Sequence, residues 1–252
     1  MLAVNNDKCT AIASGPAASK MGGSMTTQTV DCADCDWRVN KVPAKDWPEG
    51  SVRPVWQITG QYPRQVREDR GETWSVENLD DAPQRKAWAA QKDKWVIGHI
   101  PQVKHTFALI EGAYGIMNEH QVAMGESTCA AKLWAAPVSD GGHALLELSE
   151  LSQLGLERGR TAREAIQIMG DLAEQYGYYS AEWSVKKYAK FGDKATAFVM
   201  GEGGEALTVV DPKEAWVFHI LPDDTGRGAI WVAQRIPDNH ITIIANTFRI
   251  RE

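Results

Sequence analysis

The chain has 252 residues, of which 43% are hydrophobic and 24% are charged, and its net charge is -6 at pH 7. This balance fits a globular protein with its own core and excludes a disordered or fibrous chain. An acidic chain without dense basic clusters is not expected to bind nucleic acid, and no apolar run approaches the about 20 residues that span a membrane.

The chain begins with MLAVNNDK, which lacks both the basic start and the apolar stretch of a secretory signal peptide. This leaves the compartment undetermined, with a preference for the cytoplasm. Two stretches rich in β-forming residues follow at 9–15 and 24–31, separated by the small residues of 16–23. They predict a pair of strands joined by a turn.

Residues 62–94 are rich in Arg, Glu, Asp, Gln and Trp without a clean period, so we expect a surface excursion there. Two strand candidates follow at 105–119 and 120–128. The period then changes, because leucines recur at helical spacing over 144–158 and predict an amphipathic helix.

A second helix is predicted to follow Thr161, because Thr161 and Glu164 have the spacing of a capping box, in which side chains accept hydrogen bonds from backbone N–H groups. Gly177 has the position of a C-terminal cap. Residues 179–204 end in GEGG and are predicted to form a loop or insertion. They are not a phosphate-binding loop, since no Gly-Lys-Ser/Thr follows the glycines.

The last fifty residues predict a meander of strands. Two strand candidates, 205–211 and 214–221, flank the turn sequence Asp-Pro-Lys at 211–213, and two more cover 228–236 and 240–250. Strands, then two helices, then strands indicate an α+β architecture with mostly antiparallel pairing.

Cys9 opens the first predicted strand, and two interpretations of it are open. A free cysteine is commonly a small core residue. Alternatively, removal of residues 1–8 would make Cys9 the first residue, and its own α-amine could then take the thiol proton. An amine with a pKa of about 7.7 to 8.0 and a thiol with a pKa of about 8.5 make this transfer cost only about 1 kcal/mol. One residue would supply both nucleophile and base, and the uncleaved chain would be inactive.

Short motifs occur in a fixed order along the chain. They are Cys9-Thr10-x-Ile12, Gly15-x-x-Ala18-Ser19, Gly23-Ser24, Asp31, Ile100-Pro101-Gln102, Met117-Asn118-Glu119, Gly125-Glu126-Ser127, Asp211-x-x-Glu214-x-Trp216, and Ala245-Asn246 with Phe248-Arg249-Ile250. The ordered set resembles the dipeptidase and secernin family of N-terminal-nucleophile cysteine hydrolases.

The resemblance implies a four-layer αββα sandwich with mostly antiparallel sheets and a cysteine-type dipeptidase that hydrolyses small peptides without a cofactor. Residues 1–8 would be a leader, and 9–252 would be the hydrolase domain. Because members of the family are longer, we expect this domain to be the front portion of a longer one, incomplete at the C-terminus. The sequence does not determine the oligomeric state.

The resemblance also assigns roles in catalysis. Cys9 would be the nucleophile, Asp31 the acid near its amine, and Asn118 an oxyanion donor, although from sequence alone Asn118 could equally be a turn residue. Asn246 lies in an apolar strand candidate, where a buried amide needs partners, so a structural or catalytic role is expected. Gln28 stands near where relatives carry a basic residue.

Three further residues are candidates for substrate binding. Glu126 could bind the amino terminus of a substrate, and Trp37 and Trp216 could line its pocket. Cys32 and Cys35 have CxxC spacing but no second pair, so we expect two reduced thiols, with a local disulfide as the alternative.

No metal site is expected, since the six histidines form no HExxH pattern. Two other functions remain open at this point. One is a secernin-like protein that acts through partners, for instance in exocytosis, and the other is an acylase that cleaves a non-peptide amide. Fold alone does not decide between these and a dipeptidase.

Overall fold

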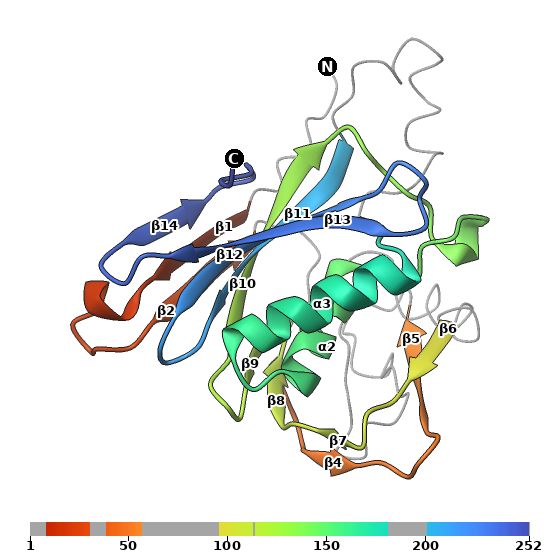
Figure 1. The fold of residues 1–252 in the computed structure, drawn as a ribbon, viewed down its shortest axis with the longest axis horizontal. Coiled ribbons are helices and arrows are strands. Elements are labelled where there is room, and N and C mark those ends of the chain that lie inside the picture. Colours follow the sequence, from red (N-terminus) through yellow and green to blue (C-terminus); the bar gives the residue numbers. More distant parts are fainter. Residues whose placement is uncertain (1–8, 31–38, 57–95, 113, 181–200, 252) are drawn as a thin grey trace, which may run out of the picture.

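The structure, a computed structural model, describes residues 9–30, 39–56, 96–112, 114–180 and 201–251. In these ranges antiparallel strands predominate, and two α-helices lie between strands in the sequence, as Figure 1 shows. The chain is therefore an α+β protein, as the sequence predicted. The surface excursion predicted at 62–94 and the cysteines Cys32 and Cys35 lie outside the described residues.

A three-stranded sheet brings the two ends of the described chain together. Its order is β14-β1-β2, with β1 at Cys9–Ser14, β2 at Met25–Val30 and β14 at Ile241–Ile244. Both pairs are antiparallel, and Cys9 lies opposite Val30. The first predicted strand pair is thus confirmed, and β14 pairs along the other edge of β1 (Figure 1).

A seven-stranded antiparallel sheet forms the centre of the fold, in the order β13-β12-β11-β10-β9-β8-β3. Its strands are β3 (Asn40–Val42), β8 (Leu109–Glu111), β9 (Gly115–Asn118), β10 (Ala123–Ala131), β11 (Gly201–Val210), β12 (Ala215–Pro222) and β13 (Ala229–Ile236). The predicted meander of the last fifty residues forms β11, β12 and β13, and the turn at 211–213 joins β11 to β12 as expected.

Two small sheets complete the strands. The first pairs β4 (Lys45–Asp46) with β7 (His105–Thr106), and the second pairs β5 (Val52–Trp56) with β6 (Val96–Pro101). The single strand candidate at 105–119 is divided among three strands, because its parts pair with different partners. Strand β7 pairs with β4, β8 pairs with β3 and β9, and β9 pairs with β8 and β10.

The prediction of a loop through GEGG was wrong, because residues 201–204 belong to β11. The glycines there have a packing reason. A Cβ atom on Gly203 would lie 2.1 Å from the carbonyl oxygen of Leu133, and one on Gly204 would lie 2.4 Å from the ring of Phe248. Close approach of neighbouring groups explains glycine inside a strand.

Helix α2 spans Leu148–Arg158, so the helix predicted at 144–158 begins four residues later. Glu147 is its N-cap, and its carboxylate accepts a hydrogen bond from Ser149 N at 2.9 Å. The residues before it are extended, and Leu146 N donates to Gly177 O. The helical spacing of leucines at 145–148 therefore reflects burial on two different elements.

Helix α3 spans Ala162–Tyr176 and matches its prediction. Thr161 Oγ1 accepts a hydrogen bond from Glu164 N at 3.1 Å, and the Glu164 carboxylate accepts one from Arg160 N at 2.8 Å. Gly177 ends the helix with φ +77°, a backbone conformation that favours glycine.

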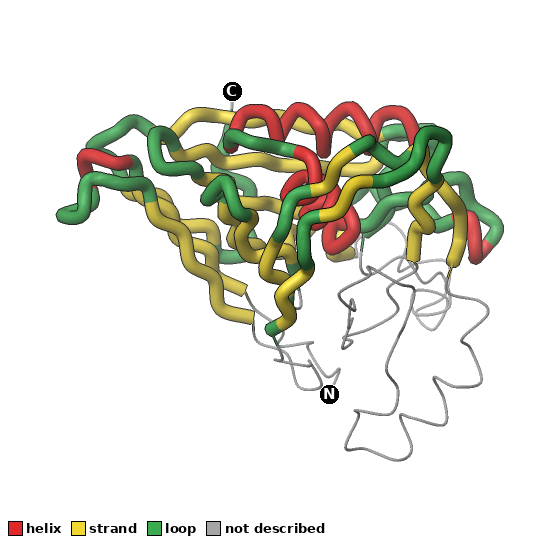
Figure 2. The backbone as a smooth tube through the Cα atoms, turned by 90° about the horizontal axis from the view of Figure 1, so that it is seen from below, coloured by secondary structure: helices red, strands yellow, loops and turns green. Residues whose placement is uncertain are grey.

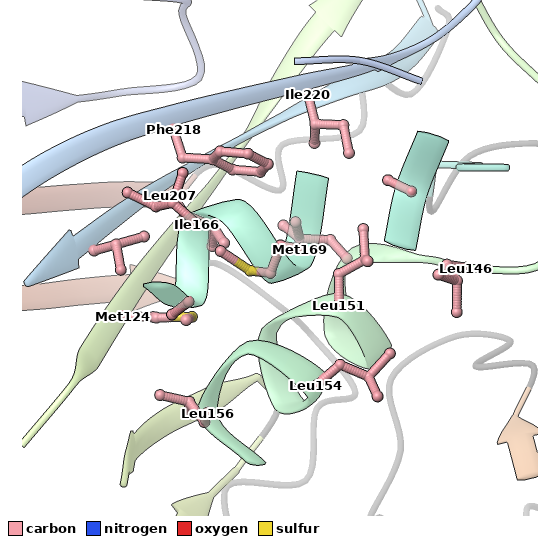
Figure 3. Packing of buried hydrophobic residues seen from close by; sticks show 14 of the residues in the cluster. Met124, Leu146, Leu151, Leu154, Leu156, Ile166, Met169, Leu207, Phe218 and Ile220 are labelled. Atoms are coloured by element: carbon pink, nitrogen blue, oxygen red, sulfur yellow. The ribbon is translucent and has the colours of Figure 1, made fainter. Parts of the chain in front are cut away.

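The central sheet is buried on both faces. Side chains alternate along β11 and β12, so that Leu207 and Phe218 pack against the helices while Ala206 and Val217 pack against the three-stranded sheet. Figure 3 shows the helix side, where these strands meet leucines of α2 and Met169 of α3. Each fully buried side chain of this size contributes about 1.5 to 3 kcal/mol of transfer free energy.

The described residues thus form three layers, which are the two helices, the central sheet and the three-stranded sheet (Figures 1 and 2). Within these ranges no α-helix covers the outer face of the three-stranded sheet, where a fourth layer was expected. Neither α2 nor α3 has the length and apolar character needed to cross a membrane.

Candidate active site

Cys9 is held in place through its own backbone. Its N–H donates to Asn246 Oδ1 at 3.0 Å, and its carbonyl oxygen accepts from Ser127 Oγ at 3.4 Å. Cys9 forms no disulfide among the described residues and is only 6% exposed. The first residue of β1 therefore lies in a buried polar site built by β10 and the segment after β14.

Asn246 differs from its prediction, because it lies beyond the end of β14 and is half-buried. Its φ is +51°, a left-handed conformation that Asn tolerates better than most residues. Asn246 N donates to Ser127 Oγ at 2.9 Å, and Nδ2 donates to Thr128 O at 2.7 Å. Asn246 therefore joins the end of β14 to both Cys9 and β10.

Glu126 lies beside Cys9 on β10 and is completely buried. Its backbone N–H donates to Gln28 Oε1 at 2.5 Å, and its carboxylate accepts from Thr128 Oγ1 at 2.9 Å. Strand β9 pairs with β10 only at Met117 and Ala123. At Glu126 the backbone of β10 is therefore not paired with β9, and its N–H bonds to the Gln28 side chain of β2 instead. Gln28, near where relatives carry a basic residue, thus fixes the backbone of Glu126.

Glu205 places a second buried carboxyl group next to Glu126. Glu205 belongs to β11 and is the register partner of Thr128 on β10, so it is the diagonal neighbour of Glu126. It is also fully buried. Burial raises the pKa of Glu126, and burial together with Glu126 raises the pKa of Glu205 well above its usual range. A hydrogen bond from Glu205 in turn favours the ionised form of Glu126, so Glu205 is the member of the pair that holds a proton more strongly.

The surroundings of this pair are buried and contain further titratable groups. Burial raises the pKa of Glu147 to about 7 and that of Cys129 to about 12. Burial and the nearby carboxylates also raise the pKa values of the hydroxyls of Tyr114 and Tyr178. The Cys129 thiol and the two tyrosine hydroxyls are therefore neutral at pH 7, whereas Glu147 is about half ionised there.

Asn118 is engaged elsewhere, at the C-terminal end of α2. Nδ2 donates to Leu156 O at 2.9 Å and to Gly159 O at 2.7 Å, while Oδ1 accepts from His120 N and Val122 N. Both amide hydrogens thus satisfy carbonyls that a helix end leaves without partners. The side chain has no donor left for an oxyanion, which argues against the role that the resemblance implied.

Trp216 lies on the helix side of the central sheet, where the guanidinium of Arg163 stacks 4.7 Å from its ring centroid. Its neighbours Ala215 and Val217 face the three-stranded sheet instead. Because side chains alternate along a strand, Trp216 points away from β1, contrary to the pocket role considered for it. Asp31 and Trp37 lie outside the described residues.

Thr128 and Glu205 were not singled out from sequence, and Ser127 was named there only as part of the motif at 125–127. Glu205 could have been noticed as a charged residue opening the apolar run ALTVV. Among the described residues no three His, Cys, Asp or Glu side chains are arranged to hold a metal ion. The assembled chemistry is a buried thiol with an adjacent carboxyl pair and an amide that fixes the cysteine backbone.

Replacing Asn246 tests how the segment after β14 is held. We expect Asn246→Gly to lower the free energy of unfolding by about 1 to 3 kcal/mol, because two side-chain hydrogen bonds are lost. Asn246→Ala should be less stable than Asn246→Gly by about 1 kcal/mol, since alanine is strained at φ +51°. Urea unfolding measures both values. Equal or greater stability of the Ala variant would contradict this backbone assignment.

A comparison with known protein families identifies the family of this chain. The family model described as Peptidase family C69 matches residues 108–252, which is more than half of the chain. The matched part contains Glu126, Glu205 and Asn246, whereas Cys9 precedes it. This family comprises cysteine peptidases of the dipeptidase A and secernin type. The chain therefore belongs to peptidase family C69, a family of hydrolases that act on peptides.

Proposed function

We propose that the chain is an N-terminal-nucleophile cysteine peptidase that hydrolyses small peptides, foremost dipeptides, through Cys9. The observation that carries this proposal is the position of Cys9. Cys9 is buried and forms no disulfide among the described residues, and its backbone nitrogen is hydrogen-bonded to Asn246, a residue of the part matched to the peptidase family. The nucleophile and the family-matched residues thus form one site.

The proposed reaction starts after residues 1–8 are removed. The free amine of Cys9 takes the thiol proton, and the thiolate attacks the scissile carbonyl carbon. Protonation of the leaving amine by the same group gives a thioester, which water hydrolyses. Asp31 directly follows Val30, the register partner of Cys9, and this supports its role as the acid that favours the ammonium form.

Asn246 takes the oxyanion role in this proposal. A primary amide has two hydrogens, and one of those on Nδ2 donates to Thr128 O. The second is available to an oxyanion that forms next to Cys9. The location of the amide beside the cysteine nitrogen supports this assignment over Asn118.

The layers of the fold support an N-terminal-nucleophile sandwich. Helices cover one face of the central sheet, and the three-stranded sheet that carries Cys9 packs on the other. A helix–sheet–sheet order is that of an αββα sandwich without its last layer. We propose this architecture for residues 9–252, with 1–8 as the leader.

Intact mass spectrometry and a hydrolysis assay together test the function. We expect the purified protein to begin at Cys9 and to hydrolyse unblocked dipeptides, while the form that retains residues 1–8 stays inactive because its Cys9 nitrogen is an amide. N-acetylated dipeptides serve as substrates for comparison. A protein that keeps residues 1–8 and hydrolyses dipeptides at full rate would refute the mechanism. A protein that is inert in both forms would favour a non-catalytic role.

A further inference from the structure

The segment 245–251, which follows β14, contacts two different parts of the protein. At Asn246 it is joined to Cys9 and to β10 by the hydrogen bonds of 2.7 to 3.0 Å described above. Further on, Phe248 and Ile250 are half-buried and pack against the buried cluster between the central sheet and the three-stranded sheet. The position of Asn246 therefore depends on how the rest of this segment is held.

His219 of β12 contacts this segment from the central sheet. Its Nε2 accepts a hydrogen bond from Arg249 N at 3.2 Å. The ring of Phe248 stands edge-on to the imidazole, with the ring centroids 4.9 Å apart and the ring planes at 67°. The His219 side chain is only 4% exposed. A buried acceptor and a ring contact together fix residues 248 and 249 on β12.

Gly204 on β11 makes room for the same ring. A Cβ atom on Gly204 would lie 2.4 Å from the ring of Phe248. Gly204 is two residues from Ala206, the register partner of His219, so the glycine and the imidazole lie on one face of the sheet. Phe248 therefore has a defined position beside His219, which the missing side chain on β11 makes possible.

Little chain separates this contact from the candidate active site. Asn246 and Phe248 are two residues apart, and two extended residues span at most about 7 Å. Asn246 also has φ +51°, a left-handed conformation that persists only where the surrounding contacts enforce it. Release of residues 248 and 249 from β12 would therefore allow Asn246 to move away from Cys9.

We propose that His219 is a positioning residue of the peptidase site. Its imidazole holds the segment 245–251 on β12, and this segment holds the Asn246 amide at Cys9. The hydrogen bond from Arg249 N needs a ring nitrogen without a proton, because a protonated imidazole has two N–H donors and no acceptor. The inference rests on the proposed function, because it takes Cys9 and Asn246 as the site of hydrolysis.

Burial favours the neutral form of His219 that this contact needs. It lowers the pKa of His219 to about 4, from an ordinary value of about 6.5. The side chains that face the ring are Phe248 and the register partners Ala206 and Val232, none of which titrates, and the side chain of Arg249 is exposed. An imidazole released into water binds a proton near pH 6.5, so acid favours release. The contact is thus complete above pH 6.5 and is lost as the pH falls through 4.

Replacement of His219 tests the inference by kinetics. We expect His219→Leu to lower kcat for an unblocked dipeptide by about 10- to 100-fold, because a misplaced group in an active site costs up to about 10²-fold. KM should change little, since an oxyanion donor acts in the transition state. His219→Gln keeps an acceptor oxygen near the position of Nε2 and should recover most of the loss.

Ile220→Ala is the matched control. Ile220 is the next residue of β12 and is buried on the helix side (Figure 3), so this change weakens the same strand without removing the acceptor. It should keep the wild-type kcat at temperatures below its unfolding. If His219→Leu does not fold, Phe248→Ala removes the ring contact from the other side and should lower kcat in the same way.

Amide hydrogen exchange gives a readout that does not depend on hydrolysis. Mass spectrometry of peptides covering 245–251 should show faster exchange in His219→Leu than in the wild type and Ile220→Ala, with protection recovered in His219→Gln. After correction for the intrinsic exchange rate, wild-type protection should fall between pH 6.5 and 4. The Gln variant should keep its protection over that range, because its amide does not titrate.

The outcomes separate the inference from the proposed function. Wild-type kcat and protection in His219→Leu would overturn the inference, as would a Gln variant as impaired as the Leu variant or one with the same pH dependence of protection as the wild type. If Cys9→Ala is inactive while the His219 variants behave like the wild type, the inference fails and the function stands. If the wild type hydrolyses no peptide, the function fails, and exchange still decides whether His219 holds the segment 245–251.

Discussion

Cys9→Ala is expected to abolish peptide hydrolysis, with a loss of about 10⁶-fold, as when the nucleophile of a serine protease is removed. The same variant should retain residues 1–8, because we expect their removal to use the same sulfur atom. The fold should survive, since alanine fits where a small buried side chain stood. Initial rates with an unblocked dipeptide and the intact mass of the same sample measure both effects.

Cys129→Ala is the matched control for this prediction. Cys129 is also buried and forms no disulfide among the described residues, and its thiol donates a hydrogen bond to Ser127 O at 3.5 Å. Its pKa is raised to about 12 by burial and by the nearby Glu126 and Cys9, which makes it a poor nucleophile. We expect this variant to keep its activity. Full activity of Cys9→Ala, or equal loss in both variants, would refute Cys9 as the nucleophile.

Local patterns in the sequence predicted most of the elements of the fold. The capping box at Thr161 and Glu164 and the glycine at 177 bounded α3 correctly, because these signals act within a few residues. The start of α2 was misplaced, because the spacing of Leu145 from Leu148 agrees with a helix although Leu145 packs from an extended segment before the helix. The glycines of β11 led to the wrong prediction of a loop, because the groups that pack closely against them are distant in sequence.

The candidate site was predictable only in part. The ordered motifs identified Cys9, Glu126 and Asn246, and the structure brings these three together. The motifs could not show that the Asn118 amide donates both of its hydrogens to backbone carbonyls that lie 38 and 41 residues away in the sequence. Glu205 escaped notice because its position beside Glu126 depends on the register of β10 with β11, which a single sequence does not reveal.

Helix α2 is fastened to the rest of the structure by a buried ion triad that sequence motifs did not indicate. Arg53 of β5 donates from Nε to Glu157 at 3.0 Å and from a terminal nitrogen to Glu150 at 2.5 Å. Glu150 and Glu157 lie two turns apart on α2, so one guanidinium bridges both. All three side chains are buried. The same helix accepts the amide of Asn118 at its C-terminal end and is capped by Glu147 at its start.

Arg53→Met is therefore expected to lower the free energy of unfolding by about 3 to 5 kcal/mol at neutral pH, because it leaves two carboxylates in the interior without their cation. In a domain of this size each kcal/mol lowers Tm by about 2 to 4 °C. Arg53→Lys should lose less, since the charge stays but the bidentate geometry goes. Adding Glu150→Gln and Glu157→Gln to Arg53→Met should recover most of the loss, because the two buried negative charges that Arg53 balanced are then removed as well. Urea unfolding at pH 7 decides the matter, and a loss below about 1 kcal/mol for Arg53→Met would mean that water or other groups compensate the two carboxylates.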